Sequence, residues 1–157
     1  MSLPHTDPHD LAARGRELSG IDYIRLIFEG ELPPPPIAQL VGFRGVEFEL
    51  GRAVFEMTPG PEHYNPIGSV HGGIALTLLD SAMGCAVHTT LAAGVGYTTL
   101  EVKTNFVRAI TAETGPIRCE GTVIHNGRRV ATAEGRVVDA DGKLLAHGTT
   151  TCLIIGA

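Results

Sequence analysis

The chain is poor in the features that mark several common protein classes. It contains no tryptophan, 5% aromatic residues and three cysteines among 157 residues. An odd number of cysteines without a Cys-x-x-Cys pair disfavours both a disulfide scaffold and a structural zinc site. We expect Cys85, Cys119 and Cys152 to be small buried side chains, and three free thiols are typical of a reducing cytoplasm.

Positive charge is also scarce, with 12 lysines and arginines against 17 acidic residues and a net charge of −5. This balance argues against a nucleic-acid partner, because such proteins usually present a basic surface. The N-terminal residues 1–7 lack the basic and apolar regions of a secretory signal peptide. The most apolar stretch, residues 72–95, is interrupted by Asp80 and His88, which disfavours a membrane span. We therefore expect a cytoplasmic protein without a membrane partner.

The chain does contain enough apolar residues to form a core, and its glycines and prolines imply many turns. Apolar residues make up 43% of the chain, with 20 glycines and ten prolines. The length favours one domain with an extension. Residues 1–36 are expected to form a helical N-terminal arm, since apolar residues recur at helical spacing from Asp10 to Glu29. Ser19 would cap a second helix in the arm, and Pro33–Pro36 would end it. The arm is expected to pack without chemistry.

Residues 37–157 are predicted to form the main domain, of the α+β class. Residues 72–91 predict one helix that is apolar on all sides, so a sheet is expected to wrap around it and bury it. The four strands after the helix, joined by turns such as Asn126-Gly127, predict an antiparallel meander. The predicted strands are residues 42–50, 52–57, 96–110, 117–125, 128–138 and 143–155.

Two glycines begin the predicted helix and can carry chemistry. Gly72 and Gly73 leave the first backbone N–H groups of the helix uncovered, at an end that carries about half a positive charge. A carbonyl oxygen that becomes negative during a reaction is stabilised in such a place. The alternative is a tight turn into a crowded helix, and the glycines alone do not decide between the two.

Asp80 is an acid within an apolar stretch of the same helix. Burying a carboxylate is costly, and a buried carboxylate tends to have a raised pKa, which suits a general base. The alternative is a structural aspartate bonded to a backbone N–H or a serine. Asp80 lies roughly 12 Å and about 800° of helix rotation beyond Gly72. Both can therefore act on one group only if the site combines two chains, which predicts a dimer with antiparallel central helices.

The run Asn65-x5-His71-Gly72-Gly73-x6-Asp80, followed by the strand Thr99–Arg108, resembles the hot-dog fold acyl-CoA thioesterases. It is most similar to their PaaI-like branch, from phenylacetate degradation. The resemblance covers about residues 38–155. It implies a long helix wrapped by an antiparallel sheet, which is the arrangement that the apolar pattern predicts independently.

The resemblance also implies roles for the residues of the motif. The Gly72 N–H, with the Asn65 side chain, would polarise the thioester carbonyl, and His71 would brace the loop near the sulfur. Asp80 of the partner subunit would activate water or attack as a nucleophile. Thr99 would orient the water.

Two positions leave open which residue supplies the hydroxyl that orients the water. Thr98 is one residue from Thr99, and a loop-length difference makes the choice between them uncertain. Some relatives carry a threonine one turn after the acid, where this chain has Gly84.

The implied reaction converts acyl-CoA and water to a carboxylic acid and free CoA, with no metal or other cofactor. The basic residues Lys103, Arg108, Arg128 and Arg129 would bind the phosphates of CoA, although each is equally well explained as ordinary surface charge. Apolar residues such as Leu76, Met83 and Tyr97 would line the acyl pocket. The family resemblance favours a homodimer that pairs into a tetramer.

Two other functions remain as alternatives. A hot-dog module could bind acyl-CoA without turnover, but it would have no use for a buried base at Asp80. A hot-dog hydratase or dehydratase would place a catalytic histidine near the start of the helix, where His71 lies. The acid at Asp80 and the glycine pair favour hydrolysis. The other histidines show no metal-ligand spacing.

Overall fold

The computed structural model describes residues 7–156. The prediction that the chain has no signal peptide was based on residues 1–7. The first six of these lie outside the described range. Two short 3-10 turns, Pro61–His63 and Ala112–Thr114, interrupt the loops. The helices are α1 (Pro8–Arg16), α2 (Gly20–Phe28), α3 (Pro36–Val41) and α4 (Gly72–His88). The strands are β1 (Phe43–Glu49), β2 (Arg52–Met57), β3 (Gly96–Phe106), β4 (Ile117–Asn126), β5 (Val130–Val138) and β6 (Leu144–Ile155).

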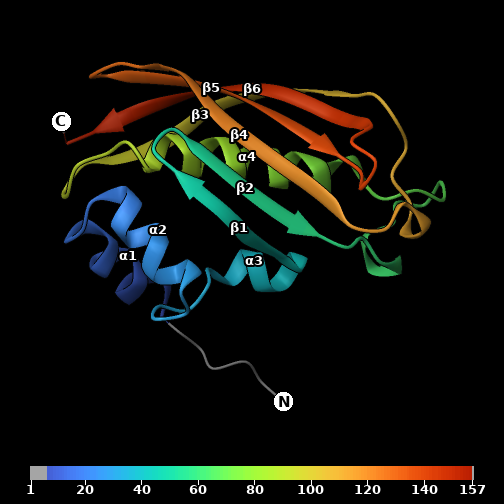
Figure 1. The fold of residues 1–157 in the computed structure, drawn as a ribbon, viewed down its shortest axis with the longest axis horizontal. Coiled ribbons are helices and arrows are strands. Elements are labelled where there is room, and N and C mark those ends of the chain that lie inside the picture. The colour runs from blue at the N-terminus through green and yellow to red at the C-terminus, as the bar shows by residue number, and fades with distance from the viewer. Residues whose placement is uncertain (1–6, 157) are drawn as a thin grey trace.

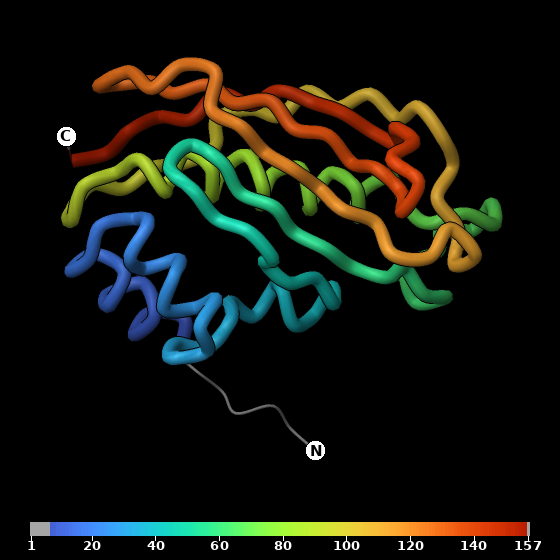
Figure 2. The backbone as a smooth tube through the Cα atoms, viewed as in Figure 1, coloured from blue at the N-terminus to red at the C-terminus, as the bar shows by residue number. Residues whose placement is uncertain are grey.

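The strands form one antiparallel sheet that curves around α4 (Figures 1 and 2). Leu78, Leu79 and Met83 of α4 are fully buried. They meet the inner face of the sheet. Along a strand such as β5, buried residues on this face alternate with more exposed residues on the other face, because successive side chains of a strand point to opposite faces. The predicted hot-dog arrangement, a long helix wrapped by an antiparallel sheet, is confirmed.

The predicted meander is correct for three strands and wrong for the fourth. The strand order is β1-β2-β4-β5-β6-β3, so β3 pairs with β6 and not with β4. Residues 107–116 do not form a hairpin, because they cross the end of the sheet. There the N–H groups of Val107 and Arg108 donate to the Leu145 carbonyl, and the Ile110 carbonyl accepts from the N–H of Val70. Among residues 7–156, β1 and β3 are therefore the two edge strands.

The expectation that α4 is buried on all sides is also wrong. Leu76 is 38% exposed, and Asp80 one turn later is exposed. The sheet covers one side of the helix, and the arm covers only its C-terminal half. A stripe of α4 around Leu76 and Asp80 remains open in one chain.

The arm forms two helices that pack beside β1 and the end of α4 (Figure 1). The Ser19 hydroxyl accepts from the N–H of Asp22 at 3.3 Å, as the predicted cap requires. The N–H of Gly20 donates to the Leu91 carbonyl at 2.9 Å. A Cβ at Gly20 would lie 1.7 Å from the His88 carbonyl oxygen, so only glycine allows this approach.

Helix α3 lies between the predicted arm and the first predicted strand, where the sequence predicted no helix. The helix begins at Pro36, with Pro35 as its N-cap. Proline is tolerated at this first helical position, because the N–H that it lacks would have no partner inside the helix. Gly42, with φ of 81°, ends the helix. None of the helices within residues 7–156 has the length and apolar character needed to cross a membrane.

Candidate active site

The loop before α4 is held closed by the side chain of Asn65. Its Oδ1 accepts from the N–H groups of Ile67 and Ser69, and its Nδ2 donates to the Ser69 hydroxyl at 3.1 Å. These bonds set the direction from which the chain enters the helix. An amide nitrogen carries two N–H groups, so one bond to Ser69 leaves the second for a ligand.

His71 is the N-cap of α4. Its Nδ1 accepts from the N–H of Gly73 at 2.8 Å, so a neutral ring carries its proton on Nε2. Among the residues that the structure describes, the N–H of Gly72 has no hydrogen-bond partner. The first open donor of the helix is therefore at Gly72, at the positive end of the helix dipole.

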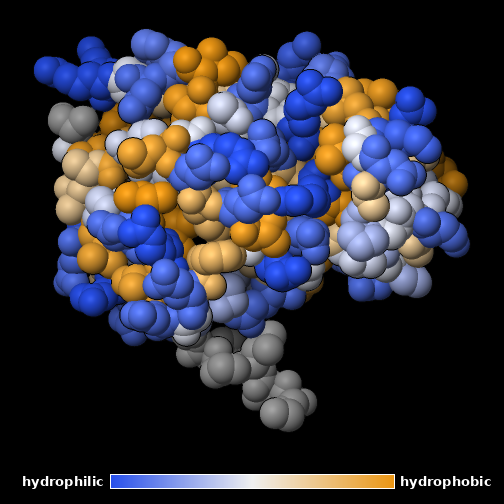
Figure 3. Space-filling model, viewed as in Figure 1, coloured by the Kyte–Doolittle hydropathy of each residue, from blue (hydrophilic) through white to orange (hydrophobic). Residues whose placement is uncertain are grey.

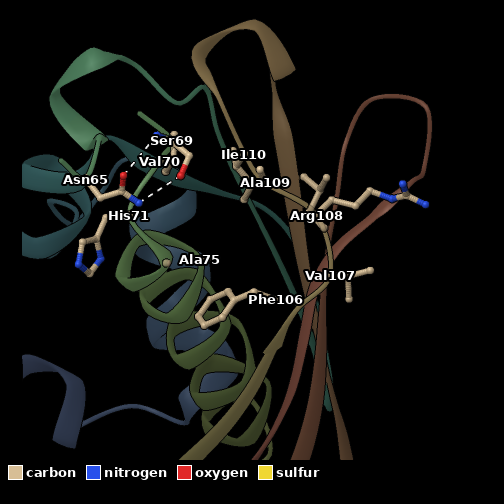
Figure 4. Close-up of a pocket in the computed structure, with 12 residues that line it drawn as sticks. Asn65, Ser69, Val70, His71, Ala75, Phe106, Val107, Arg108, Ala109 and Ile110 are labelled. Carbon is tan, nitrogen blue, oxygen red and sulfur yellow. Dashed lines mark hydrogen bonds between the residues drawn. The ribbon is translucent and has the colours of Figure 1, made fainter. Parts of the chain in front are cut away.

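A pocket of about 390 Å³ opens at this end of α4 (Figure 4). The Phe106 ring points toward the start of the helix, while the Arg108 side chain extends away from it. A Cβ at Gly72 would lie 3.0 Å from the Phe106 ring, so glycine lets the ring approach the open N–H. Sequence reasoning missed Phe106, because its role depends on how β3 passes the start of α4.

Asp80 lies on the open stripe of α4 and accepts a hydrogen bond from a threonine. The Thr99 hydroxyl donates to Asp80 Oδ1 at 2.9 Å, whereas no such bond joins Thr98 to Asp80. The sequence predicted a buried carboxylate, but Asp80 is exposed in one chain because the sheet covers only the other side of the helix.

One chain does not bring Asp80 to the pocket at Gly72. Asp80 does not line that pocket, and the eight residues between them span roughly 12 Å of helix. The donor and the acid therefore occupy separate positions along α4.

Gly84 leaves space for an aromatic side chain one turn after the acid. A Cβ at Gly84 would lie 2.9 Å from the Tyr97 hydroxyl. Burial raises the pKa of Tyr97 well above its usual value, and burial likewise raises the pKa of the Cys85 thiol to about 12. Both groups are therefore neutral at physiological pH. Met83, expected in the acyl pocket, is instead fully buried under the sheet.

The four basic residues that were predicted to bind CoA do not lie close together within one chain. They are Lys103, Arg108, Arg128 and Arg129. All four are exposed, but only Arg108 lines the pocket at Gly72. Arg128 and Arg129 lie in the β4–β5 hairpin, which reaches the C-terminal end of α4, where the Thr90 hydroxyl donates to Asn126 Oδ1 at 3.3 Å. Within residues 7–156, no group of three or more histidine, cysteine or acidic side chains could hold a metal ion.

Comparisons with known proteins agree with this arrangement. The family model described as "Thioesterase superfamily" matches residues 67–146. A candidate esterase of Saccharolobus solfataricus is 33% identical over 134 residues, which cover 85% of this chain and 94% of that protein. The 1,4-dihydroxy-2-naphthoyl-CoA hydrolase of Listeria monocytogenes is 23% identical over 75% of this chain and 94% of its own.

A solved structure gives the same result. A candidate thioesterase of Ralstonia eutropha JMP134, described as phenylacetic acid degradation-related, superposes with a TM-score of 0.75. It is 29% identical, and the match covers 83% of this chain and 98% of that one. The central helix begins with two glycines and lies inside a curved sheet. The chain belongs to the thioesterase superfamily and is similar to the PaaI-like, phenylacetate-degradation branch.

Proposed function

We propose that the protein hydrolyses acyl-CoA thioesters in sites that two chains build together. The observation that carries this proposal is the pairing of exposed Asp80 with the Thr99 hydroxyl, at 2.9 Å, on the helix whose first N–H is open. The naphthoyl-CoA hydrolase among the relatives supports a CoA thioester as the substrate.

A two-fold dimer would complete the site. The open stripe of α4 includes an exposed leucine, Leu76, and the edge strand β3 offers unpaired backbone groups for pairing. Antiparallel α4 helices across a two-fold axis would bring Gly72 of one chain toward Asp80 of the partner subunit. By the family resemblance, two such dimers would pair into a tetramer.

In this site the thioester carbonyl oxygen would lie against the N–H of Gly72 and the second amide N–H of Asn65, which would stabilise the negative charge that develops there. Asp80 would take a proton from water as the water attacks the carbonyl carbon, or would itself attack as the nucleophile. The thiolate of CoA would leave, and His71, with its proton on Nε2, would face the sulfur. Arg108 lines the pocket and suits a phosphate of CoA. We propose that Lys103, Arg128 and Arg129 also bind phosphates of CoA.

The test is release of free thiol from a panel of aryl, short, medium and long acyl-CoAs by the wild-type protein. We expect turnover of at least one class. Tight acyl-CoA binding without turnover would instead favour the non-catalytic binding module. Loss of the conjugated double bond from an enoyl-CoA, without thiol release, would favour the hydratase.

Replacing Thr99 by valine is expected to lower kcat roughly tenfold or more, since a hydrogen bond to a charged group is worth about 1.5–3 kcal/mol. Valine keeps the shape of threonine but cannot hold the Asp80 carboxylate. The measurement is kcat in the same thiol-release assay. Thr98→Val is the matched control and is expected to keep wild-type kcat. Equal activity of the two variants would contradict a role for the Thr99 hydroxyl.

A further inference from the structure

A second cavity, of about 460 Å³, lies between the arm and the sheet. This volume is within the range of small-molecule sites in proteins. Apolar side chains gather on the visible face where the arm meets the sheet (Figure 3). Four of the five phenylalanines of the chain line the cavity, together with three consecutive prolines and apolar residues of α2. These are Phe28, Phe43, Phe48, Phe55, Pro33, Pro34, Pro35, Ile24 and Ile27.

The Gln39 and Arg44 side chains, which line the cavity, already have partners. The Gln39 Nε2 donates to the Pro34 carbonyl at 3.2 Å, and Arg44 pairs with Glu56 at 3.2 Å. The Cys85 thiol is a neutral group. A ligand of this cavity therefore meets no unpaired charge, and an apolar ligand avoids the cost of burying an unsatisfied polar group.

The aromatic rings of the cavity wall pack against one another. The rings of Phe28 and Phe48 pack edge to face with centroids 5.8 Å apart, and the Phe48 and Phe55 rings do so at 5.6 Å. A Cβ at Gly45 would lie 2.4 Å from the Phe48 ring, so glycine permits this ring position. Edge-to-face contacts of this kind stabilise the ring positions that form the cavity wall.

The cavity and the proposed reaction centre share helix α4. Among the described residues, Cys85 is the one that α4 contributes to its lining. Cys85 follows Asp80 by five residues, which is roughly 7.5 Å along the helix and about 140° around it. An acyl group that passes around α4 from Asp80 toward the C-terminal end of the helix would reach this cavity.

We propose that the arm cavity receives the distal, apolar part of the acyl group, so that the N-terminal arm selects acyl-CoAs with long hydrocarbon chains. This inference rests on the proposed thioesterase function. Burial of each further methylene raises kcat/KM about fourfold until the cavity is full.

The experiment compares wild type with Ile27→Trp on straight-chain acyl-CoAs from butanoyl to hexadecanoyl. Tryptophan at position 27 fills the cavity, so kcat/KM for dodecanoyl-CoA is expected to fall at least tenfold while that for butanoyl-CoA stays within twofold. Leu40→Trp is the matched control, because Leu40 of α3 is 82% exposed and does not line the cavity. It is expected to match wild type at every chain length.

Phe28→Ala tests the same cavity in the opposite direction. Phe28 is 53% exposed, so its removal costs little stability and enlarges the cavity, and the preferred chain length is expected to increase. Equal effects of Ile27→Trp on short and long substrates, with an unchanged preference in Phe28→Ala, would overturn this inference and leave the thioesterase function standing. Absence of turnover on every acyl-CoA by the wild type would overturn both.

Discussion

Replacement of Asp80 by asparagine is expected to lower kcat at least about a hundredfold, which corresponds to roughly 2.7 kcal/mol of transition-state stabilisation. Asparagine has the shape of aspartate, and its Oδ1 can still accept the hydrogen bond that Thr99 donates to Asp80. It cannot take a proton from water or act as a nucleophile. The loss is therefore expected in the chemical step, and the Kd for acyl-CoA, measured by calorimetry, is expected to change little.

Asp141→Asn is the charge-matched control. Asp141 lies in the turn before β6, with its side chain 80% exposed, and outside the pocket at Gly72. This variant removes the same charge and is expected to keep wild-type kcat. Wild-type turnover in Asp80→Asn would make Asp80 a structural residue and would remove the general base from the proposed mechanism.

Mixed dimers would show which chain supplies the acid. Asp80→Asn and Gly72→Val are each expected to be inactive, the second because the added side chain meets the Phe106 ring. If each site takes Gly72 from one chain and Asp80 from the other, a dimer of the two variants has one intact site. Random pairing after co-expression should then restore about a quarter of wild-type activity. No recovery in dimers shown to be mixed would place the two residues in one site of one chain.

Features that depend on neighbouring residues could be predicted from the sequence. The Ser19 cap, the start of α4 at Gly72 and the hairpin at Asn126-Gly127 each follow from a few consecutive side chains, and the structure contains them. The sequence also predicted that a sheet buries α4. This prediction is correct for the side of the helix that faces the sheet, because apolar residues occupy the positions that are buried there.

Features that depend on distant contacts could not be predicted in this way. The pairing of β3 with β6 requires residues 107–116 to cross the sheet, which no local pattern indicates. The exposure of Asp80 depends on which side of α4 the sheet leaves open. The residues of the arm cavity come from α2, α3, the loop between them, β1, β2 and α4, so their proximity appears only in the folded chain.

A row of glycines across the sheet is a further feature of this kind, and it leads to the largest expected effect on stability. Gly121 of β4 pairs with Gly135 of β5, which pairs in turn with Gly148 of β6. A Cβ at Gly121 would lie 2.4 Å from the Ala82 carbonyl carbon and oxygen. These are backbone atoms within α4, so the helix as a whole would have to move away from the sheet.

Gly121→Ala is therefore expected to destabilise the protein by about 3 kcal/mol, the upper part of the usual range for overpacking. For a chain of this size that lowers Tm by about 6–12 °C. Gly135→Ala is the matched control. Its Cβ would meet Leu79 Cδ2 at 2.9 Å, Met83 Cγ at 3.0 Å and, less closely, the Glu120 carbonyl oxygen at 3.3 Å. The two nearest atoms belong to side chains, which shift at less cost than the backbone of a helix.

The control is expected to lose at most about 1 kcal/mol, because alanine also restricts the unfolded chain more than glycine does. Thermal unfolding of the two variants and the wild type should be compared at one protein concentration, since the proposed dimer would make Tm concentration-dependent. Equal shifts in the two variants would mean that α4 moves as easily as two side chains do. The close backbone contact at Gly121 would then not be what holds the helix against the sheet.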